Sequence, residues 1–245
     1  MSALAASPQA LHPGIRVRSL QAGYPGRQVL RGVTLAFPLG KVSVLVGPGG
    51  SGKTTFVRAL VGDETAQEVW RTGAVELPAS RLRVLRQMPA KSAGRLCDVL
   101  APQGTPAENA PAEARRALDA VWQADSPARG WLEPDLEQPL SEVAPWRRRL
   151  AAFTRVIAVP APHYVFDEPD LELPPEAIGL LAGQIRRLAG AATILLVTHN
   201  LTLAERVADF AVLMVDGEVI EAAAGDRFFR HPRHPRTRDF VRLGC

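Results

Sequence analysis

One short segment combines glycines, a lysine and hydroxyl side chains at a fixed spacing. Gly47 is followed, after four residues, by Gly52, Lys53 and a threonine, which is the pattern of a phosphate-binding loop. Glycines let successive backbone N–H groups curve around phosphate oxygens, and a helix that starts there directs its positive dipole end at the anion. Lys53 would add a full positive charge, and the Thr54 hydroxyl can bind Mg²⁺. The candidate binding residues are Gly47, Pro48, Gly49, Gly50, Ser51, Gly52, Lys53, Thr54 and Thr55.

A second feature is a pair of acidic residues, Asp167 and Glu168, directly after the apolar residues 164–166. A parallel sheet would place carboxylates at the carboxyl end of this strand beside the phosphate-binding loop. There Asp167 would hold Mg²⁺, directly or through water, and Glu168 would polarise an attacking water. Two acids that only cap a strand are the alternative, and the glycine-rich loop favours the catalytic interpretation.

A third candidate is His199, which follows the apolar residues 194–197 and a threonine. A histidine at the end of a buried strand is usually a structural residue whose hydrogen bonds are satisfied. Because this strand is expected to lie beside the other two, His199 can instead reach the outermost phosphate as a hydrogen-bonding sensor.

Periodic apolar residues predict the elements that would position these groups. Strands are predicted at residues 15–20, 29–37, 41–46, 74–77, 83–85, 163–166 and 193–197. Helices are predicted from the glycine-rich loop to about residue 60, over 175–188 and over 204–207, before a hairpin at 211–221. The order predicts an α/β fold with a P-loop NTPase core, whose sheet is mainly parallel with an antiparallel β part.

Residues 93–160 differ from the rest because they are rich in Ala, Arg and Pro and their apolar residues recur at helical spacing. We therefore predict an inserted α-helical subdomain at 93–160. The nucleotide-binding core would consist of residues 15–92 and 161–245, and residues 1–14 would form a flexible N-terminal arm.

Composition excludes several classes of protein. The 245 residues are 47% hydrophobic and 22% charged, as in ordinary globular proteins. No apolar run has the length of a membrane span and no signal peptide is recognisable, so association with a membrane would require a partner. The two cysteines have no metal or redox spacing, which indicates a reducing, cytoplasmic setting. The net charge of +4 comes from scattered arginines, and we expect no nucleic-acid partner.

The three anchors, in this order and with a helical insertion between the first two, resemble an ATP-binding cassette (ABC) ATPase. The resemblance extends from about residue 15 to residue 243 and equates the loop with Walker A, Asp167-Glu168 with Walker B plus the catalytic glutamate, and His199 with the switch histidine. It implies that Tyr24, which precedes Gly47 by 23 residues, stacks on adenine. It also implies that Gln87 contacts Mg²⁺ or the attacking water and senses the membrane subunit. A turn tyrosine and an exposed loop glutamine remain alternatives.

The resemblance also implies partners and a location. Two such chains, as a homodimer or as a heterodimer with another ABC ATPase, would enclose two Mg-ATP and drive transmembrane permease subunits from the cytoplasmic face of the cell membrane, as peripheral proteins. A substrate-binding protein would take part indirectly. Residues 197–209 and 228–237 resemble bacterial importer ATPases for phosphate and polar amino acids. We expect an importer of phosphate or a related small anion.

The family signature LSGGQ is degenerate in this chain. Its closest match is Leu140-Ser141, which assigns Ser141 to the nucleotide of the partner subunit, but counting back from Asp167 without gaps places residues 143–147 there instead. No glycine occurs between Gly130 and Gly179 in either register, and the aspartate expected after Walker B is replaced by Pro174.

These departures predict intact ATP binding with weak or partner-dependent hydrolysis. A regulatory or structural ATP-binding protein with little hydrolysis is the alternative. A small-molecule kinase is disfavoured, because Glu168 and His199 suit water activation better than transfer to a bound acceptor.

Overall fold

The computed structural model describes residues 13–62, 69–77, 82–86 and 93–244. Its first sheet is antiparallel and has the strand order β2-β1-β4. These strands are β1 (Pro13–Tyr24), β2 (Arg27–Pro38) and β4 (Trp70–Glu76). The strand predicted at 15–20 is therefore longer, and residues 13 and 14 belong to it rather than to the predicted arm, whose other residues lie outside the described part.

The second sheet has the strand order β5-β6-β7-β3-β8-β9. It consists of β5 (Leu82–Leu85), β6 (His163–Asp167), β7 (Thr193–Val197), β3 (Val42–Val46), β8 (Phe210–Val215) and β9 (Glu218–Ala224). All pairings are parallel except β8 with β9. Every residue of β3, β6 and β7 is buried, which explains why their sequences are almost continuously apolar.

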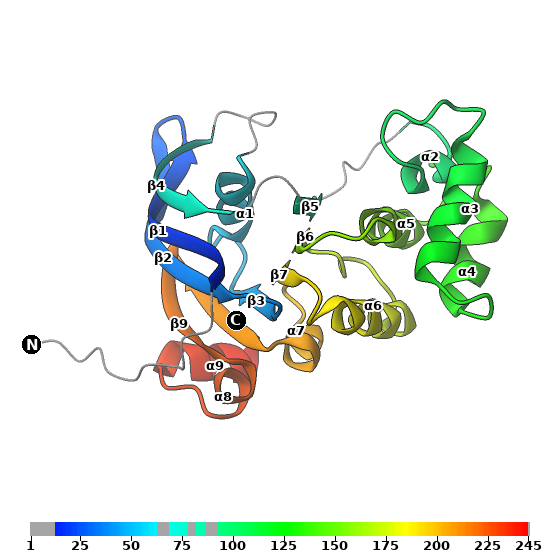
Figure 1. Ribbon diagram of the computed structural model, residues 1–245. Coiled ribbons are helices and arrows are strands. Elements are labelled where there is room, and N and C mark those ends of the chain that lie inside the picture. The colour runs from blue at the N-terminus through cyan, green and yellow to red at the C-terminus, as the bar shows by residue number, and fades with distance from the viewer. Residues whose placement is uncertain (1–12, 63–68, 78–81, 87–92, 245) are drawn as a thin grey trace, which may run out of the picture.

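Helices cover both faces of this sheet (Figure 1). Helix α1 (Lys53–Val61) packs in one apolar core with the antiparallel sheet and residues such as Leu45, Val165 and Leu195 of the parallel strands. The neighbouring residues of the same strands, such as Val44, Phe166 and Leu196, belong to the other core. That second core includes α6 (Pro175–Leu188), α7 (Leu201–Val207), α8 (Gly225–Arg230) and α9 (Pro235–Leu243). The predicted helix at 204–207 thus starts earlier, where Asn200 accepts a hydrogen bond from the Leu203 N–H as N-cap.

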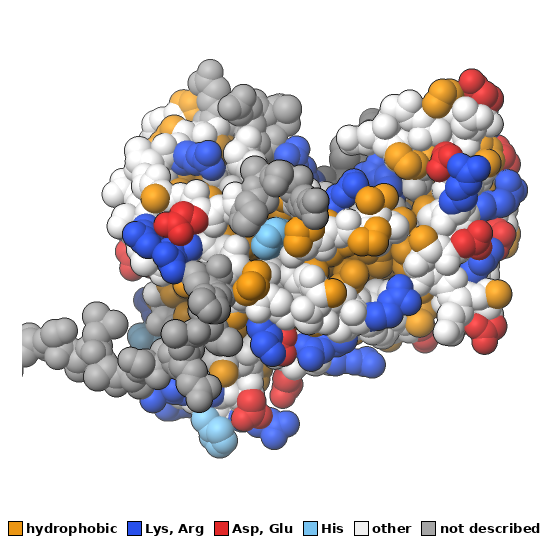
Figure 2. Space-filling model, in the orientation of Figure 1, with side chains coloured by type: hydrophobic (Ala, Val, Ile, Leu, Met, Phe, Trp, Pro, Cys, Tyr) orange, Lys and Arg blue, Asp and Glu red, His pale blue; other side chains and the backbone are white. Residues whose placement is uncertain are grey.

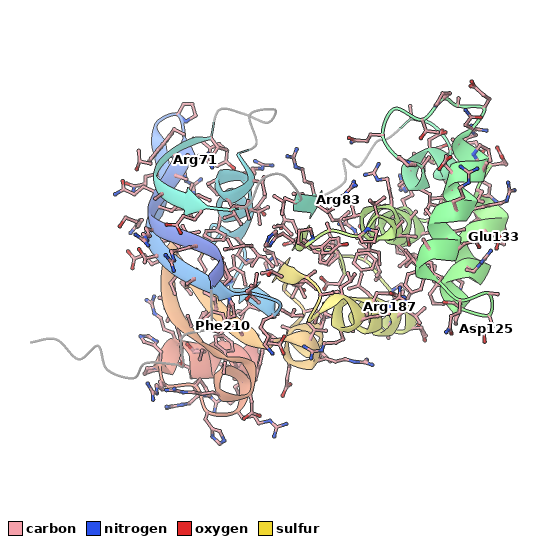
Figure 3. All side chains as sticks on the ribbon, in the orientation of Figure 1. Arg71, Arg83, Asp125, Glu133, Arg187 and Phe210 are labelled. Carbon is pink, nitrogen blue, oxygen red and sulfur yellow. The ribbon has the colours of Figure 1, made fainter. Side chains whose placement is uncertain are left out.

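Residues 96–158 form the helices that the sequence predicts for the insertion, drawn in green in Figure 1. They are α2 (Leu96–Leu100), α3 (Ala110–Val121), α4 (Pro127–Leu132), the 3₁₀ turn η2 (Glu133–Asp135) and α5 (Pro145–Ala158). Gln184 and Arg187 of α6 both donate hydrogen bonds to the Val121 carbonyl, which ties these helices to the core. Arg187 is labelled in Figure 3. None of the helices in the described ranges is both long and apolar enough to cross a membrane.

Candidate functional site

The glycine-rich loop connects the buried strand β3 to α1, as the sequence predicts. Gly47 has φ 155°, and a Cβ at this position would lie 2.1 Å from the Met214 carbonyl oxygen. Gly52, the N-cap of α1, has φ 102°. Only glycine adopts both conformations without strain. Within the described residues, the N–H groups of Gly50, Gly52 and Lys53 donate to no other residue, so they remain available to an anion.

Lys53 lies within this loop, and the residue is 4% exposed. Its Nζ donates to the Gly47 carbonyl (2.9 Å), the Pro48 carbonyl (3.0 Å) and Ser51 Oγ (3.3 Å). Burial lowers the pKa of Lys53, while Glu168 and Asp167 act in the opposite direction. The lysine therefore bridges the loop, and its charge lies close enough to both acids to be attracted by them.

Asp167 ends strand β6 and is 3% exposed. Its Oδ1 has no hydrogen-bond partner among the described residues. Burial, with a smaller contribution from Glu168, raises the pKa of Asp167 to about 6. An unpartnered, buried carboxylate oxygen fits a Mg²⁺ ligand. The described residues contain no group of three His, Cys, Asp or Glu that would hold a metal by themselves, so Mg²⁺ would also need Thr54 and oxygens of a bound phosphate.

Replacing Asp167 tests how its raised pKa affects the stability of the fold. Its raised pKa means that the folded state binds the proton more tightly than the unfolded state, so this group stabilises the fold below pH 4 and the contribution is lost as pH rises through about 6. Asp167→Asn should remove that dependence and raise the free energy of unfolding at pH 8 by about 2–3 kcal/mol. Chemical denaturation of the nucleotide-free protein at pH 5 and pH 8 measures both effects. Equal stabilities of variant and parent at pH 8 would contradict the prediction.

Glu168 is held in a defined conformation beside His199. Its Oε1 lies 2.7 Å from His199 Nε2, and its N–H donates to the Val197 carbonyl (2.9 Å). Its φ is 51°, a left-handed conformation that costs a non-glycine residue about 1–3 kcal/mol. The adjacent strands β6 and β7 thus bring together the two residues that the sequence assigns to water activation and phosphate sensing.

Two polar residues that the sequence analysis did not single out support this edge of the sheet. Thr198 donates its hydroxyl to the Asp170 carboxylate at 2.8 Å and accepts the Asn200 N–H at 2.9 Å. These bonds connect the residues after β6 with those after β7, on either side of the Glu168–His199 contact. In the sequence, the only signal for Thr198 and Asp170 was their position close to His199 and to the acidic pair.

Tyr24 lies beside the phosphate-loop helix. Its hydroxyl accepts a hydrogen bond from Arg58 NH1 (2.9 Å) and lies 3.4 Å from Thr55 Oγ1. The structure therefore places Tyr24 against α1, and its role in stacking on adenine remains a prediction. Gln87, the other residue assigned from the resemblance, lies outside the described residues.

Helix α5, which precedes Walker B, starts at Pro145 with Ala144 as N-cap. Ser141 is exposed in the turn before it. Pro145 is the third residue of 143–147, the segment that the register counted back from Asp167 assigns to the signature, and this register remains a prediction. Proline has no N–H to donate there.

The next two residues of α5, Trp146 and Arg147, contact other residues of the inserted helical segment. The rings of Trp146 and Trp131 form an edge contact at 5.4 Å, the Arg147 guanidinium lies 5.3 Å from the Trp146 ring, and Arg147 forms an ion pair with Asp135. Large side chains therefore flank the backbone at this helix start.

The fold and the site together define an ATP-binding cassette. A model of the ABC transporter family matches residues 30–170, which is more than half of the chain. The chain belongs to this family, whose ATP-binding proteins are ATPases. The sequence-based prediction of an ABC ATPase with an α/β fold is confirmed.

Several relatives match along almost their whole length. The L-cystine transport system ATP-binding protein of Escherichia coli is 30% identical over 93% of this chain and 96% of its own. A probable amino-acid ABC transporter ATP-binding protein of Haemophilus influenzae is 28% identical (93% and 94% covered), and a phosphate import ATP-binding protein of Mycobacterium tuberculosis is 29% identical (97% and 91% covered). These relatives do not single out phosphate, which the sequence analysis favoured.

Solved structures share the fold. An ATP-binding subunit of an ABC transporter superposes with a TM-score of 0.71 at 22% identity, covering 94% of this chain and 98% of its own. A bacterial Atm1-family ABC exporter with ATP bound has a TM-score of 0.74 at 18% identity, covering 95% of this chain and 42% of its own. At these identities the likeness concerns the fold alone.

Proposed function

We propose that this chain is the ATP-binding and ATP-hydrolysing subunit of an ABC importer for a small polar solute, either phosphate or a polar amino acid. The observation that carries the proposal is the convergence of Lys53, Asp167, Glu168 and His199 at one edge of the parallel sheet. The names of the relatives support import, and they include both classes of solute.

Each residue has a distinct task in the proposed reaction. The loop N–H groups and Lys53 bind the outer phosphates of ATP, with Thr55 and Ser51 shaping the loop. Glu168 orients and polarises the attacking water, and His199 holds the Glu168 carboxylate in place. Asp167 and Thr54 would hold Mg²⁺, which supplies charge neutralisation at the phosphates.

A cavity of about 760 Å³ supports a permease as partner. It lies between the edge strand β5 and helices α3 and α5, and Figure 2 shows the surface hollowed between the main body and the lobe of inserted helices, with Lys and Arg side chains at its margin. Arg83, labelled beside this hollow in Figure 3, lines it together with Ala117, Arg116, Arg155 and Val159. We assign it to a cytoplasmic segment of the permease that combines apolar and acidic side chains. Such docking would make the chain a peripheral protein on the cytoplasmic face of the membrane.

The residues at the start of α5 support a dimer whose two ATP sites differ in activity. In the register of residues 143–147, Pro145 and Trp146 replace the signature glycines that would present N–H groups to the partner's nucleotide. A self-paired dimer would then have two weakened sites, whereas pairing with a complete ABC ATPase would give one competent site on this chain's Walker motifs.

The same observation favours a second candidate, a regulatory ATP-binding subunit that hydrolyses little. Both candidates bind ATP and contact a permease. They differ in whether hydrolysis at this chain's own site is needed for uptake.

Transport measured with a Walker A variant tests the proposal. Lys53→Ala removes the charge that faces the phosphates, and loss of one charge-assisted contact should weaken ATP binding by at least about tenfold. In proteoliposomes that contain this chain and its permease, the variant should abolish ATP-dependent uptake of radiolabelled phosphate or cystine. Exposed Lys41→Ala, which leaves the loop intact, is the matched control. ATP affinity of Lys53→Ala equal to the parent would contradict the site, and uptake that survives with affinity lost would favour the regulatory candidate.

A further inference from the structure

Arg149 is a charged side chain in an unusual position. It lies in the second turn of α5 and the residue is only 8% exposed. Among the described residues no carboxylate lies within ion-pair distance of it, and its Nε has no hydrogen-bond partner. The charge of Arg149 acts on the Asp167 carboxylate from beyond that distance. Burial of a cation with no ion pair at contact distance is unfavourable, so packing alone does not account for an arginine at this position.

Arg149 donates a hydrogen bond to Glu168, at the edge of the parallel sheet where the candidate site lies. Its NH1 donates to the Glu168 carbonyl oxygen at 3.0 Å. The same oxygen accepts the Leu171 N–H at 3.4 Å, and the Glu168 N–H is bonded to Val197. The peptide after Glu168 is thus fixed from α5, while the carboxylate of the same residue contacts His199.

We propose that Arg149 is a positioning residue, which holds the left-handed backbone of Glu168 and so fixes where its carboxylate points. The inference rests on the proposed function, in which Glu168 orients the attacking water. Arg149 would act through the Glu168 backbone rather than by its own contact with the water or the nucleotide.

The location of Arg149 gives this contact a second consequence. Pro145, at the start of α5, lies one helical turn before Arg149. In the register of residues 143–147, it would face the nucleotide of a partner subunit. A shift of α5 on pairing would be transmitted through Arg149 to the Glu168 peptide. Arg149 would therefore make the orientation of the Glu168 carboxylate depend on whether the dimer is formed.

Hydrogen exchange of the nucleotide-free protein tests the positioning without any need for turnover. Arg149→Met keeps the length and apolar bulk of the side chain but removes the donors. We expect the amides of Glu168 and Leu171 to exchange about tenfold faster, because a hydrogen bond to a charged group is lost. Strand β7 (Thr193–Val197) serves as internal reference and should be unchanged. Arg149→Lys should restore part of the protection, and Arg115→Met, at an exposed position of α3, is the matched control.

Kinetics of the complete transporter provide the second measurement. Arg149→Met should lower kcat about tenfold with KM within about twofold of the parent, and Arg149→Lys should recover part of the loss. Exchange within twofold of the parent at both amides would overturn the proposal, as would an equal rise in β7, which would show a general loss of packing. An unchanged kcat with a raised KM would also overturn it. If the parental transporter hydrolyses no ATP, the proposed function fails, while the exchange data still decide the role of Arg149.

Discussion

Glu168→Gln should lower ATP hydrolysis at least about a hundredfold while leaving Mg-ATP binding nearly intact. Glutamine keeps the shape of the side chain and can still accept a hydrogen bond from His199 Nε2, but it lacks the negative charge that polarises water. Steady-state phosphate release by the transporter and nucleotide titration of the isolated chain measure the two quantities. Glu205→Gln, at an exposed position of α7, is the matched control and should hydrolyse at the parental rate.

Paired with a complete ABC ATPase, the same variant should accumulate an ATP-bound dimer, because the closed state is no longer discharged by hydrolysis. Size-exclusion chromatography with Mg-ATP would detect it. Hydrolysis by Glu168→Gln at the parental rate would show that Glu168 is not the base, and the contact with His199 would then need another explanation.

The second large effect concerns the start of α5. Purified alone, the chain should bind Mg-ATP and hydrolyse it very slowly, since each missing phosphate donor costs about 2.7–4 kcal/mol in the transition state, by analogy with the loss of an oxyanion donor. Replacing Pro145 and Trp146 together by glycine should restore backbone approach and raise the rate at least about tenfold. ATPase turnover of parent and double variant, without any partner, is the measurement.

Two controls accompany this experiment. Adding Glu168→Gln to the double variant should abolish the gained activity, which ties the gain to this chain's own site. Thermal melting checks the fold, because the change removes the contact between Trp146 and Trp131. A parental rate typical of importer ATPases, lost in Glu168→Gln, would refute the idea of a weakened signature.

Much of the site could be predicted because its chemistry lies in local sequence patterns. The glycine spacing before Lys53, the two acids after an apolar strand and the histidine after another are each short segments. Strands β3, β6 and β7 are buried on both faces, so their sequences are almost continuously apolar and were recognised with nearly their observed bounds. Element ends were less accurate, as at residues 13 and 14, because fraying and capping depend on neighbours that no local pattern contains.

The sequence by itself thus determined the class of protein, the order of the elements and the candidate residues for phosphate, metal and water. Only the tertiary structure decided that Glu168 contacts His199, that Thr198 bonds Asp170 and that α5 starts at Pro145. It also decided that Arg149 reaches the Glu168 carbonyl, although its place on the apolar face of α5, one turn before Phe153, was a signal in the sequence. The physical reason is that these contacts join segments distant in sequence, and the strand order that brings them together is a property of the packed sheet.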